Sequence, residues 1–228
     1  MTVCARFIPL ILFLLLQPAA AFGGILISMQ NTNIISSGFI DVMVSSTATP
    51  GAPDLLDSFS AKLVLTPVGA AASGGLQFNS TQSDAQLGLG NYVFAANSLT
   101  PAPLGNVTSG SGTNDTYTFG DATVSGTGVS LDSSQAAFLL ARVDLSVFGA
   151  TTGSQYTIAL ANDTFTDFLD PAFASLSIDP ASFTAATITI GTLSAAVPEP
   201  GHWLLILGLC SLLAGLRLRR KMAACAEA

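Results

Sequence analysis

The sequence predicts an all-β domain between residues 22 and 196, an antiparallel β-sandwich or jelly roll. Three observations predict this fold class. Short apolar runs in this part of the 228-residue chain alternate with period two, as half-buried strands do. Clusters of Gly, Pro, Asn and Asp separate the runs and supply turns. No long amphipathic helical pattern interrupts them, so we expect many short strands with frequent reversals.

The period-two alternation assigns strands to residues 38–46, 136–149, 154–162 and 186–193, and places Asp41 on the outward face of the first. The expected inward sets are Ile40, Val42 and Val44; Leu139, Ala141, Val143, Leu145 and Val147; Tyr156, Ile158 and Leu160; and Ile188 and Ile190. Residues 61–67 and 91–97 are two further predicted strands.

The N-terminus has the three parts of a secretory signal peptide in residues 1–21. A basic residue, Arg6, precedes an apolar run from Phe7 to Leu16, and small residues follow it. Cleavage is expected after Ala21, which makes Phe22 the new N-terminus. The alternative is an N-terminal membrane anchor, for which the run is short, because a span needs about 20 apolar residues.

The expected domain is strongly acidic and has no cysteine. Twelve aspartates and no glutamate face two bases, Lys62 and Arg142, which gives a formal charge of −10. Nucleic acid is therefore excluded as a partner, and anionic lipid is disfavoured, because both would be repelled. Cys4, Cys210 and Cys225 all lie in the terminal segments, so no disulfide can stabilise the domain.

The C-terminus, residues 197–228, contains three further parts in fixed order. The tetrapeptide Val197, Pro198, Glu199 and Pro200 comes first, and its prolines keep it extended for a processing enzyme. An apolar run from Trp203 to Leu216 follows, and we expect a transmembrane helix over about 201–216. A basic cluster then holds the end on the cytoplasmic side: Arg217, Arg219, Arg220 and Lys221.

These C-terminal parts resemble the PEP-CTERM sorting signal. The resemblance implies recognition of residues 197–200 by an exosortase, a membrane cysteine transpeptidase. It also implies an exported chain, anchored first in the inner membrane and then placed on the cell surface or in the matrix of an exopolysaccharide-producing Gram-negative bacterium. The alternative is a plain tail anchor after a proline-rich stalk.

The middle domain resembles cohesin-like domains of bacterial surface proteins. The resemblance covers residues 25–160 and includes the alternating strand Phe39–Val44, residues 57–67, the segment 76–80, and the late pair 139–147 and 154–162. It implies a β-sandwich. Cohesins bind dockerin modules, but no residue of this chain transfers that activity, so the partner stays open.

The sequence favours a non-enzymatic protein without a cofactor. The only histidine, His202, lies outside the domain, so a Ser-His-Asp arrangement cannot form there, and no phosphate-binding loop is present. Asn162, Asp163, Asp167 and Asp170 are either calcium ligands or ordinary turn residues. The rival functions are a module binding a polysaccharide or protein, and an enzyme acting on extracellular polymer through two aspartates.

Overall fold

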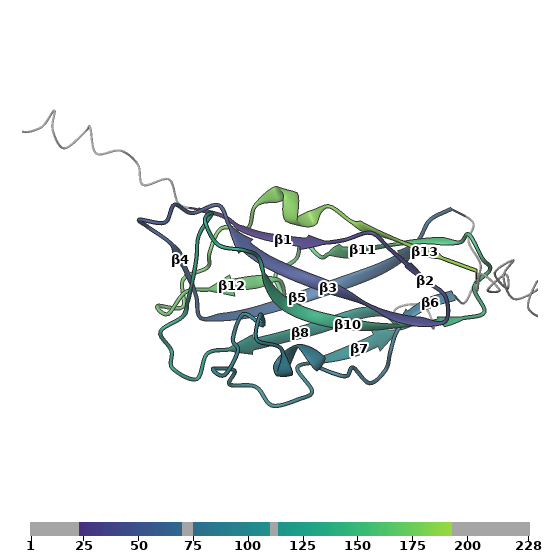
Figure 1. Cartoon of the computed structure of the whole chain (residues 1–228), viewed down its shortest axis with the longest axis horizontal. Helices are drawn as coiled ribbons and strands as arrows, with labels where there is room; N and C mark the ends of the chain where they lie inside the picture. The colour runs from purple at the N-terminus through teal and green to yellow at the C-terminus, as the bar shows by residue number, and fades with distance from the viewer. Residues whose placement is uncertain (1–22, 70–74, 110–113, 193–228) are drawn as a thin grey trace, which may run out of the picture. The chain divides into compact units, whose positions relative to one another are not determined.

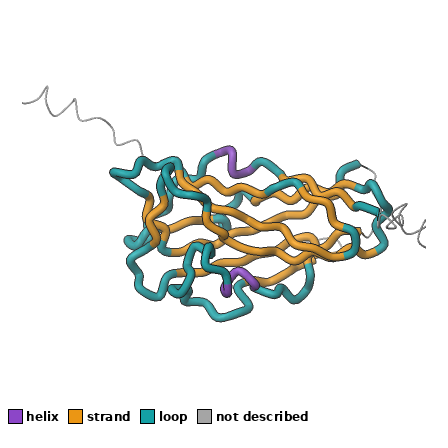
Figure 2. Tube along the Cα trace, in the orientation of Figure 1, coloured by secondary structure: helices purple, strands orange, loops and turns teal. Residues whose placement is uncertain are grey.

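A computed structural model describes residues 23–69, 75–109 and 114–192 of the chain. These residues form a sandwich of two β-sheets whose strands run lengthwise, and loops lie at both ends and along the lower side in the view of Figures 1 and 2. The predicted signal peptide with its Ala21–Phe22 cleavage site and the predicted sorting segment 197–228 lie outside the described residues. Across the described stretches, no helix is long and apolar enough to cross a membrane.

The first sheet has four strands, and every neighbouring pair is antiparallel. In order across the sheet they are β1 (Ile25–Met29), β3 (Ser37–Ser46), β10 (Phe138–Phe148) and β6 (Gly75–Phe78). On β3 the predicted inward residues are buried, because alternate side chains point to opposite faces of a strand. The predictions for 38–46 and for a strand within 136–149 are therefore confirmed.

The second sheet is wider, and one of its strand pairs is parallel. In order across the sheet the strands are β2 (Thr32–Ile34), β13 (Ala186–Ile190), β11 (Gln155–Leu160), β5 (Ser58–Pro67), β8 (Asn114–Ala122) and β7 (Gly105–Ser109), with β12 (Asp167–Leu169) also paired to β5. The pair β2–β13 is parallel, so the antiparallel prediction fails there. The predicted strands at 61–67, 154–162 and 186–193 are confirmed.

Small elements complete the described part. The strands β4 (Asp54–Leu56) and β9 (Val129–Leu131) form a separate antiparallel ribbon. Two short 3₁₀ helices, η1 (Ala85–Gly88) and η2 (Pro180–Phe183), lie in connections. Asp179 caps η2, since its carboxylate accepts a hydrogen bond from the Ala181 N–H at 2.8 Å.

The core between the sheets is rich in aromatic side chains that contact one another. The rings of Tyr117 and Phe119 on β8 stack with centroids 5.1 Å apart. Phe59 on β5 lies within 6.1 Å, centroid to centroid, of Phe94, Phe119 and Phe168. Because large aromatic side chains bury much apolar area, they supply the core that a cysteine-free domain of this size needs.

A bulge in β10 corrects the predicted facing of Leu139. The pairing with β3 shifts between Leu139 and Ala141, so Leu139 lies opposite Met43 while Ala141 lies opposite Val42. Leu139 is therefore on the other face from Ala141, and the extra residue, Leu140, is part of the buried core. A strict period of two cannot show an inserted residue.

The predicted strand at 91–97 is wrong, because this segment forms consecutive turns. The Ala95 N–H donates to the Tyr92 carbonyl at 3.0 Å, and the Asn97 N–H donates to the Phe94 carbonyl at 2.8 Å. Ala96 has a positive φ of 59°. The apolar residues 92–94 are all buried, which a half-exposed strand would not allow.

Candidate functional site

Loops from distant parts of the sequence meet at one end of the sandwich, on the left of Figure 1 near β4 and β12. The Asp57 N–H donates to the Leu169 carbonyl, and the Thr123 N–H donates to the Asp57 carbonyl, both at 2.8 Å. The Val124 N–H donates to the Asn97 carbonyl, also at 2.8 Å. These bonds join residues 54–57, 97–100, 122–128 and 163–175 into one surface, which we call the loop end.

The side chain of Asp57 connects two segments of the loop end by hydrogen bonds. Its side chain is buried, and one carboxylate oxygen accepts hydrogen bonds from the Thr123 hydroxyl and, at 3.2 Å, from the Gly128 N–H. Gly128 has a φ of 69°, and a Cβ there would lie 3.1 Å from Pro171 and 3.3 Å from Leu55. Glycine is therefore required at 128 both by the backbone conformation and by the packing of two loops.

Phe173 is the most exposed large apolar residue of the loop end, with 77% of its surface accessible. The turn that presents it is held by Asp170, whose Oδ1 accepts from the N–H groups of Ala172 and Ala174, each at 2.8 Å. Phe173 itself has a φ of 61°, a left-handed conformation that a bulky residue rarely adopts. An aromatic side chain held outward in a strained turn suggests a function for the loop.

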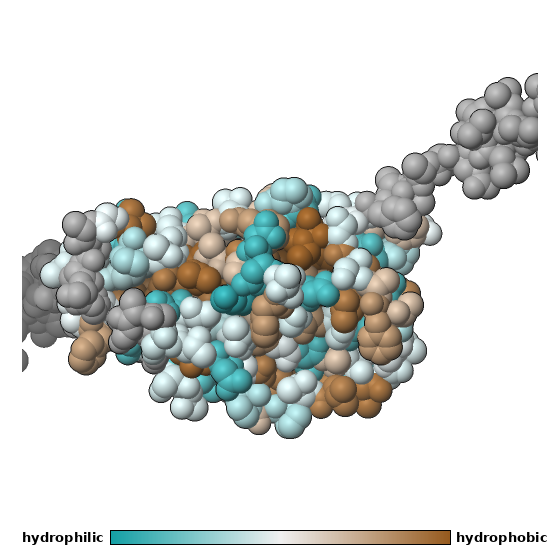
Figure 3. Space-filling view, turned by 180° about the vertical axis from the view of Figure 1, so that it is seen from behind, coloured by the Kyte–Doolittle hydropathy of each residue, from teal (hydrophilic) through white to brown (hydrophobic). Residues whose placement is uncertain are grey.

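Other apolar side chains are exposed on the same surface. Their accessible fractions are 41% for Leu55, 59% for Leu99, 64% for Val124 and 45% for Phe165. Figure 3 shows one face of the molecule, where apolar residues lie in separate patches among polar ones. A group of exposed apolar residues surrounded by polar ones is typical of an interaction surface.

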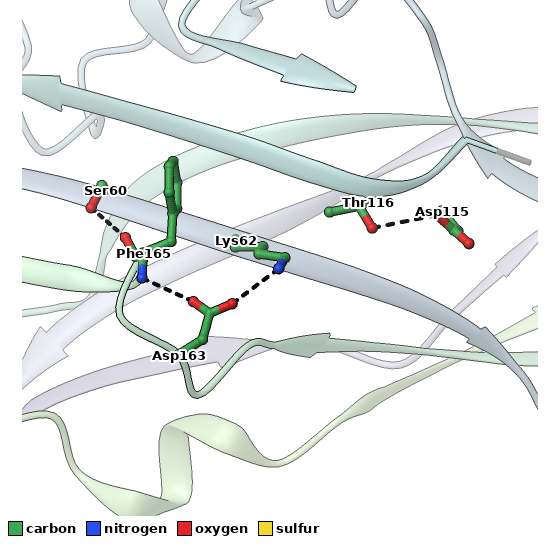
Figure 4. A network of polar contacts seen from close by, with 6 residues as sticks. All are labelled: Ser60, Lys62, Asp115, Thr116, Asp163 and Phe165. Atoms are coloured by element: carbon green, nitrogen blue, oxygen red, sulfur yellow. Dashed lines mark hydrogen bonds and ion pairs between the residues drawn. The ribbon is translucent and has the colours of Figure 1, made fainter. Parts of the chain in front are cut away.

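The three aspartates predicted as calcium ligands or turn residues lie at the loop end, and each accepts a hydrogen bond from a backbone N–H one or two residues further along the chain. Asp163 accepts from Lys62 Nζ at 3.0 Å and from the Phe165 N–H at 3.1 Å (Figure 4). The hydrogen bond from Lys62 holds the pKa of Asp163 below its usual value. Asn162 is exposed just before it in the chain.

The other two predicted ligands are engaged separately. Asp167 accepts from the Ser175 hydroxyl at 3.2 Å and from the Phe168 N–H at 3.0 Å, while Asp170 holds the Phe173 turn. Among the described residues, no group of three or more His, Cys, Asp or Glu side chains could hold a metal ion. The contacts therefore favour the turn-residue alternative for all three aspartates.

Asp121 is a buried carboxylate that sequence reasoning did not single out. Its Oδ2 accepts from the hydroxyls of Tyr92 at 2.7 Å and Ser98 at 2.5 Å, and its Oδ1 from the N–H groups of Thr100 at 2.9 Å and Ala122 at 2.7 Å. Burial, together with the bond to Asp121, raises the pKa of Tyr92, so Tyr92 stays a protonated donor. All four acceptor positions of this carboxylate are used in fixing loops, which is a structural role.

Both bases of the domain are paired with aspartates. Arg142 donates to Asp41 through Nε at 2.7 Å and through a terminal nitrogen at 2.8 Å, and its guanidinium lies 4.0 Å from the centroid of the Phe39 ring. Lys62 is paired with Asp163. Neither base is therefore available to hold an anionic ligand without breaking an existing pair.

A small polar hollow of about 220 Å³ lies on β2 and β13, lined by Asn31, Thr32, Asn33, Thr187 and Thr189. Its lining contains no aromatic ring on which a sugar could stack. The hollow therefore offers hydroxyl and amide groups only, and it adds no specific support for the predicted polysaccharide partner.

No family model and no curated protein matches the chain. Among solved structures, the chain is similar to cohesins. The sixth cohesin of scaffoldin B from Acetivibrio cellulolyticus, solved with a dockerin, has 9% identity and a TM-score of 0.45 over 73% of this chain and 99% of that one. The non-cellulosomal cohesin of Archaeoglobus fulgidus has 14% identity and a TM-score of 0.41 over 76% and 95%.

A type I cohesin from Clostridium thermocellum, solved in complex with a dockerin, has 11% identity and a TM-score of 0.41 over 73% of this chain and 99% of that one. The matches agree with the resemblance to cohesin-like domains found in the sequence. At these scores they give no information on partners or activity, and the assignment of a β-sandwich depends on the strand pairing itself.

Proposed function

We propose that the chain is an exported, non-catalytic surface protein, sorted through a C-terminal PEP-CTERM signal by an exosortase. The observation that carries the proposal is the fixed order of three parts: the Pro198-Glu199-Pro200 tripeptide, the apolar run Trp203–Leu216, and the basic cluster 217–221. The apolar run and the basic residues suit a temporary membrane anchor with its end in the cytoplasm. The signal peptide at residues 1–21 would supply the export step.

Mass spectrometry of the mature protein tests this proposal. We expect Phe22 at the N-terminus and loss of the Trp203–Leu216 segment. The variant Glu199→Ala should remain in the membrane, because the charged centre of the recognition motif is removed. Glu227→Ala is the matched control, since it changes the chain's other glutamate outside the motif. Recovery of intact Ala228 on the cell surface of a strain with active exosortase would contradict the proposal.

A second candidate function is a protein-binding module that uses the loop end. The specific observation is Phe173, an exposed aromatic side chain presented by a strained turn. Aromatic residues that enter a partner's pocket often dominate binding. Asp167 and Asp170 lie beside it, in a domain of charge −10, so the expected partner has an apolar pocket bordered by Lys or Arg.

Photo-crosslinking in the native cell tests this second candidate. A photoreactive amino acid at position 173 should give a discrete protein adduct, whereas the same amino acid at Phe148, at the opposite end, should not. Phe148 is a matched control because it is exposed to nearly the same degree, 72% against 77%. The adduct should disappear with an Asp170→Ala change, which releases the turn. Equal adducts from both positions, or an adduct to polysaccharide, would argue against a protein partner at the loop end.

A further inference from the structure

The chain leaves the described domain at the end opposite to the loop end, on the right of Figure 1. The Gly191 N–H donates to the Ile34 carbonyl at 2.9 Å, and the Gly153 N–H donates to the Ile190 carbonyl at 2.8 Å. The Val147 N–H donates to the Ser36 carbonyl at 2.9 Å. The Val68 N–H also donates to the Gln155 carbonyl. These bonds join four segments into one surface, which we call the exit end: residues 34–37, 67–69, 147–155 and 190–192.

The exit end is uncharged and exposes apolar side chains. None of its residues is Asp, Glu, Lys, Arg or His. Ile35 is 43% accessible, Val68 is 45% and Phe148 is 72%. The adjoining strands carry Asp144, three residues before Val147 on β10, and Asp115 on β8.

The loop end differs from the exit end in charge. It also exposes apolar residues, but these lie among carboxylates: Asp54, Asp57, Asp163, Asp167 and Asp170. A membrane surface with anionic headgroups therefore repels the loop end and has no such effect on the exit end. Charge thus distinguishes two surfaces that are similar in their apolar content.

The length of the following segment limits where the exit end can lie. This step rests on the proposed function, in which the apolar run after Pro200 is inserted in the membrane. Residues 192–200 span at most about 32 Å when fully extended. This is close to the length of the sandwich itself, since the eleven residues of β10 extend over about 33 Å. The tether therefore limits the exit end to within about 32 Å of the inserted run, and the charge difference between the two ends decides which of them faces the lipid.

We propose that, in the membrane-anchored precursor, the exit end lies on the lipid surface, with Ile35, Val68 and Phe148 in the interfacial layer. The loop end then faces away from the membrane. The membrane segment supplies the attachment, the apolar side chains supply the local contact, and the acidic loop end supplies the orientation. An acidic domain can therefore rest on a membrane to which it would not bind in free form.

The test uses residues 22–228, the precursor without its predicted signal peptide, in lipid nanodiscs of phosphatidylcholine and phosphatidylglycerol with a quencher on the lipid headgroups. Cys210 and Cys225 are replaced by Ser, and a single cysteine carrying a fluorophore is introduced by Phe148→Cys or, as the matched control, Phe173→Cys. We expect severalfold stronger quenching at position 148 than at 173. The variant Ile35→Ser/Val68→Ser, made in the Phe148→Cys protein, should reduce that quenching. Circular dichroism checks that each variant keeps its β-sheet signal.

The outcomes separate this inference from the proposed function. If the chain fails to enter the nanodiscs, the predicted anchor is wrong and the proposed function fails with it. If the chain enters and positions 148 and 173 are quenched equally, the anchor stands and the proposed orientation is overturned. Stronger quenching at 173 would show that the loop end lies on the lipid.

Discussion

Replacing Asp121 by Ala should destabilise the domain by about 3–5 kcal/mol. The carboxylate accepts four hydrogen bonds at 2.5–2.9 Å, two from hydroxyls and two from backbone N–H groups. Alanine removes all four and leaves the Tyr92 hydroxyl, on a side chain only 2% accessible, without its acceptor. One unpaired buried donor costs about 1–3 kcal/mol, and each bond to a charged group contributes about 1.5–3 kcal/mol, with incomplete additivity.

Urea unfolding followed by circular dichroism measures this loss, because the midpoint shift at constant slope gives the change in unfolding free energy. Tyr92→Phe removes only one of the four donors and should cost about 1 kcal/mol. In the double variant Asp121→Ala/Tyr92→Phe, the buried unpaired hydroxyl is gone, so the total should be less than the sum of the two single changes. A loss below about 1 kcal/mol for Asp121→Ala would refute the role of the carboxylate in fixing these loops.

Four further changes test other parts of the structure. Tyr156→Phe should stabilise the domain by about 1 kcal/mol in urea unfolding, because the buried Tyr156 hydroxyl has no hydrogen-bond partner among the described residues. In the same assay Gly75→Ala should be strongly destabilising, since its Cβ would overlap that hydroxyl, and Tyr156→Phe should partly restore the stability. Phe173→Gly should raise the melting temperature, because glycine relieves about 1 kcal/mol of backbone strain at φ 61°. Lys62→Met should raise the pKa of Asp163 toward the ordinary aspartate value in an NMR titration. The folded pKa of Asp163 is lowered, so its pairing stabilises the protein above the unfolded-state pKa, and this contribution is lost as the pH falls through the folded value. The acid-induced loss of stability should therefore be smaller in the variant.

The sequence predicted the fold where one face of a strand contacts water and the other contacts the core. On β3, β11 and β13 the alternation of apolar and polar residues matches the buried and exposed faces. In these strands the local pattern is sufficient, because a strand's two faces are fixed by its own pleat. The pairing order of the sheets and the parallel β2–β13 pair have no such local signal, since they depend on contacts between residues far apart in the chain.

The errors have a different physical cause. At residues 91–97 the apolar side chains are buried by turns, and a run of buried residues has the same composition in a turn as in a strand. At Leu139 one inserted residue changes the face of every position before it. The sequence also did not predict the loop end as an exposed apolar surface. Its residues Leu55, Leu99, Val124 and Phe173 are far apart in the chain, and only the fold brings their loops to the same end of the sandwich.

The composition of the domain, twelve aspartates and no glutamate, has a structural explanation. Within the described residues, at least nine of the twelve accept a hydrogen bond from a backbone N–H: Asp57, Asp84, Asp121, Asp132, Asp144, Asp163, Asp167, Asp170 and Asp179. The short aspartate side chain reaches N–H groups one or two residues along its own chain, as at Asp163 and Asp170, and the longer glutamate is poorly suited to this geometry. In a domain without cysteine, these bonds hold loops that disulfides hold in many small secreted domains. The charge of −10 is then largely a consequence of aspartates that hold backbone N–H groups, both in turns and between distant segments, so a ligand site should be sought among exposed side chains that have no such structural role, as at Phe173.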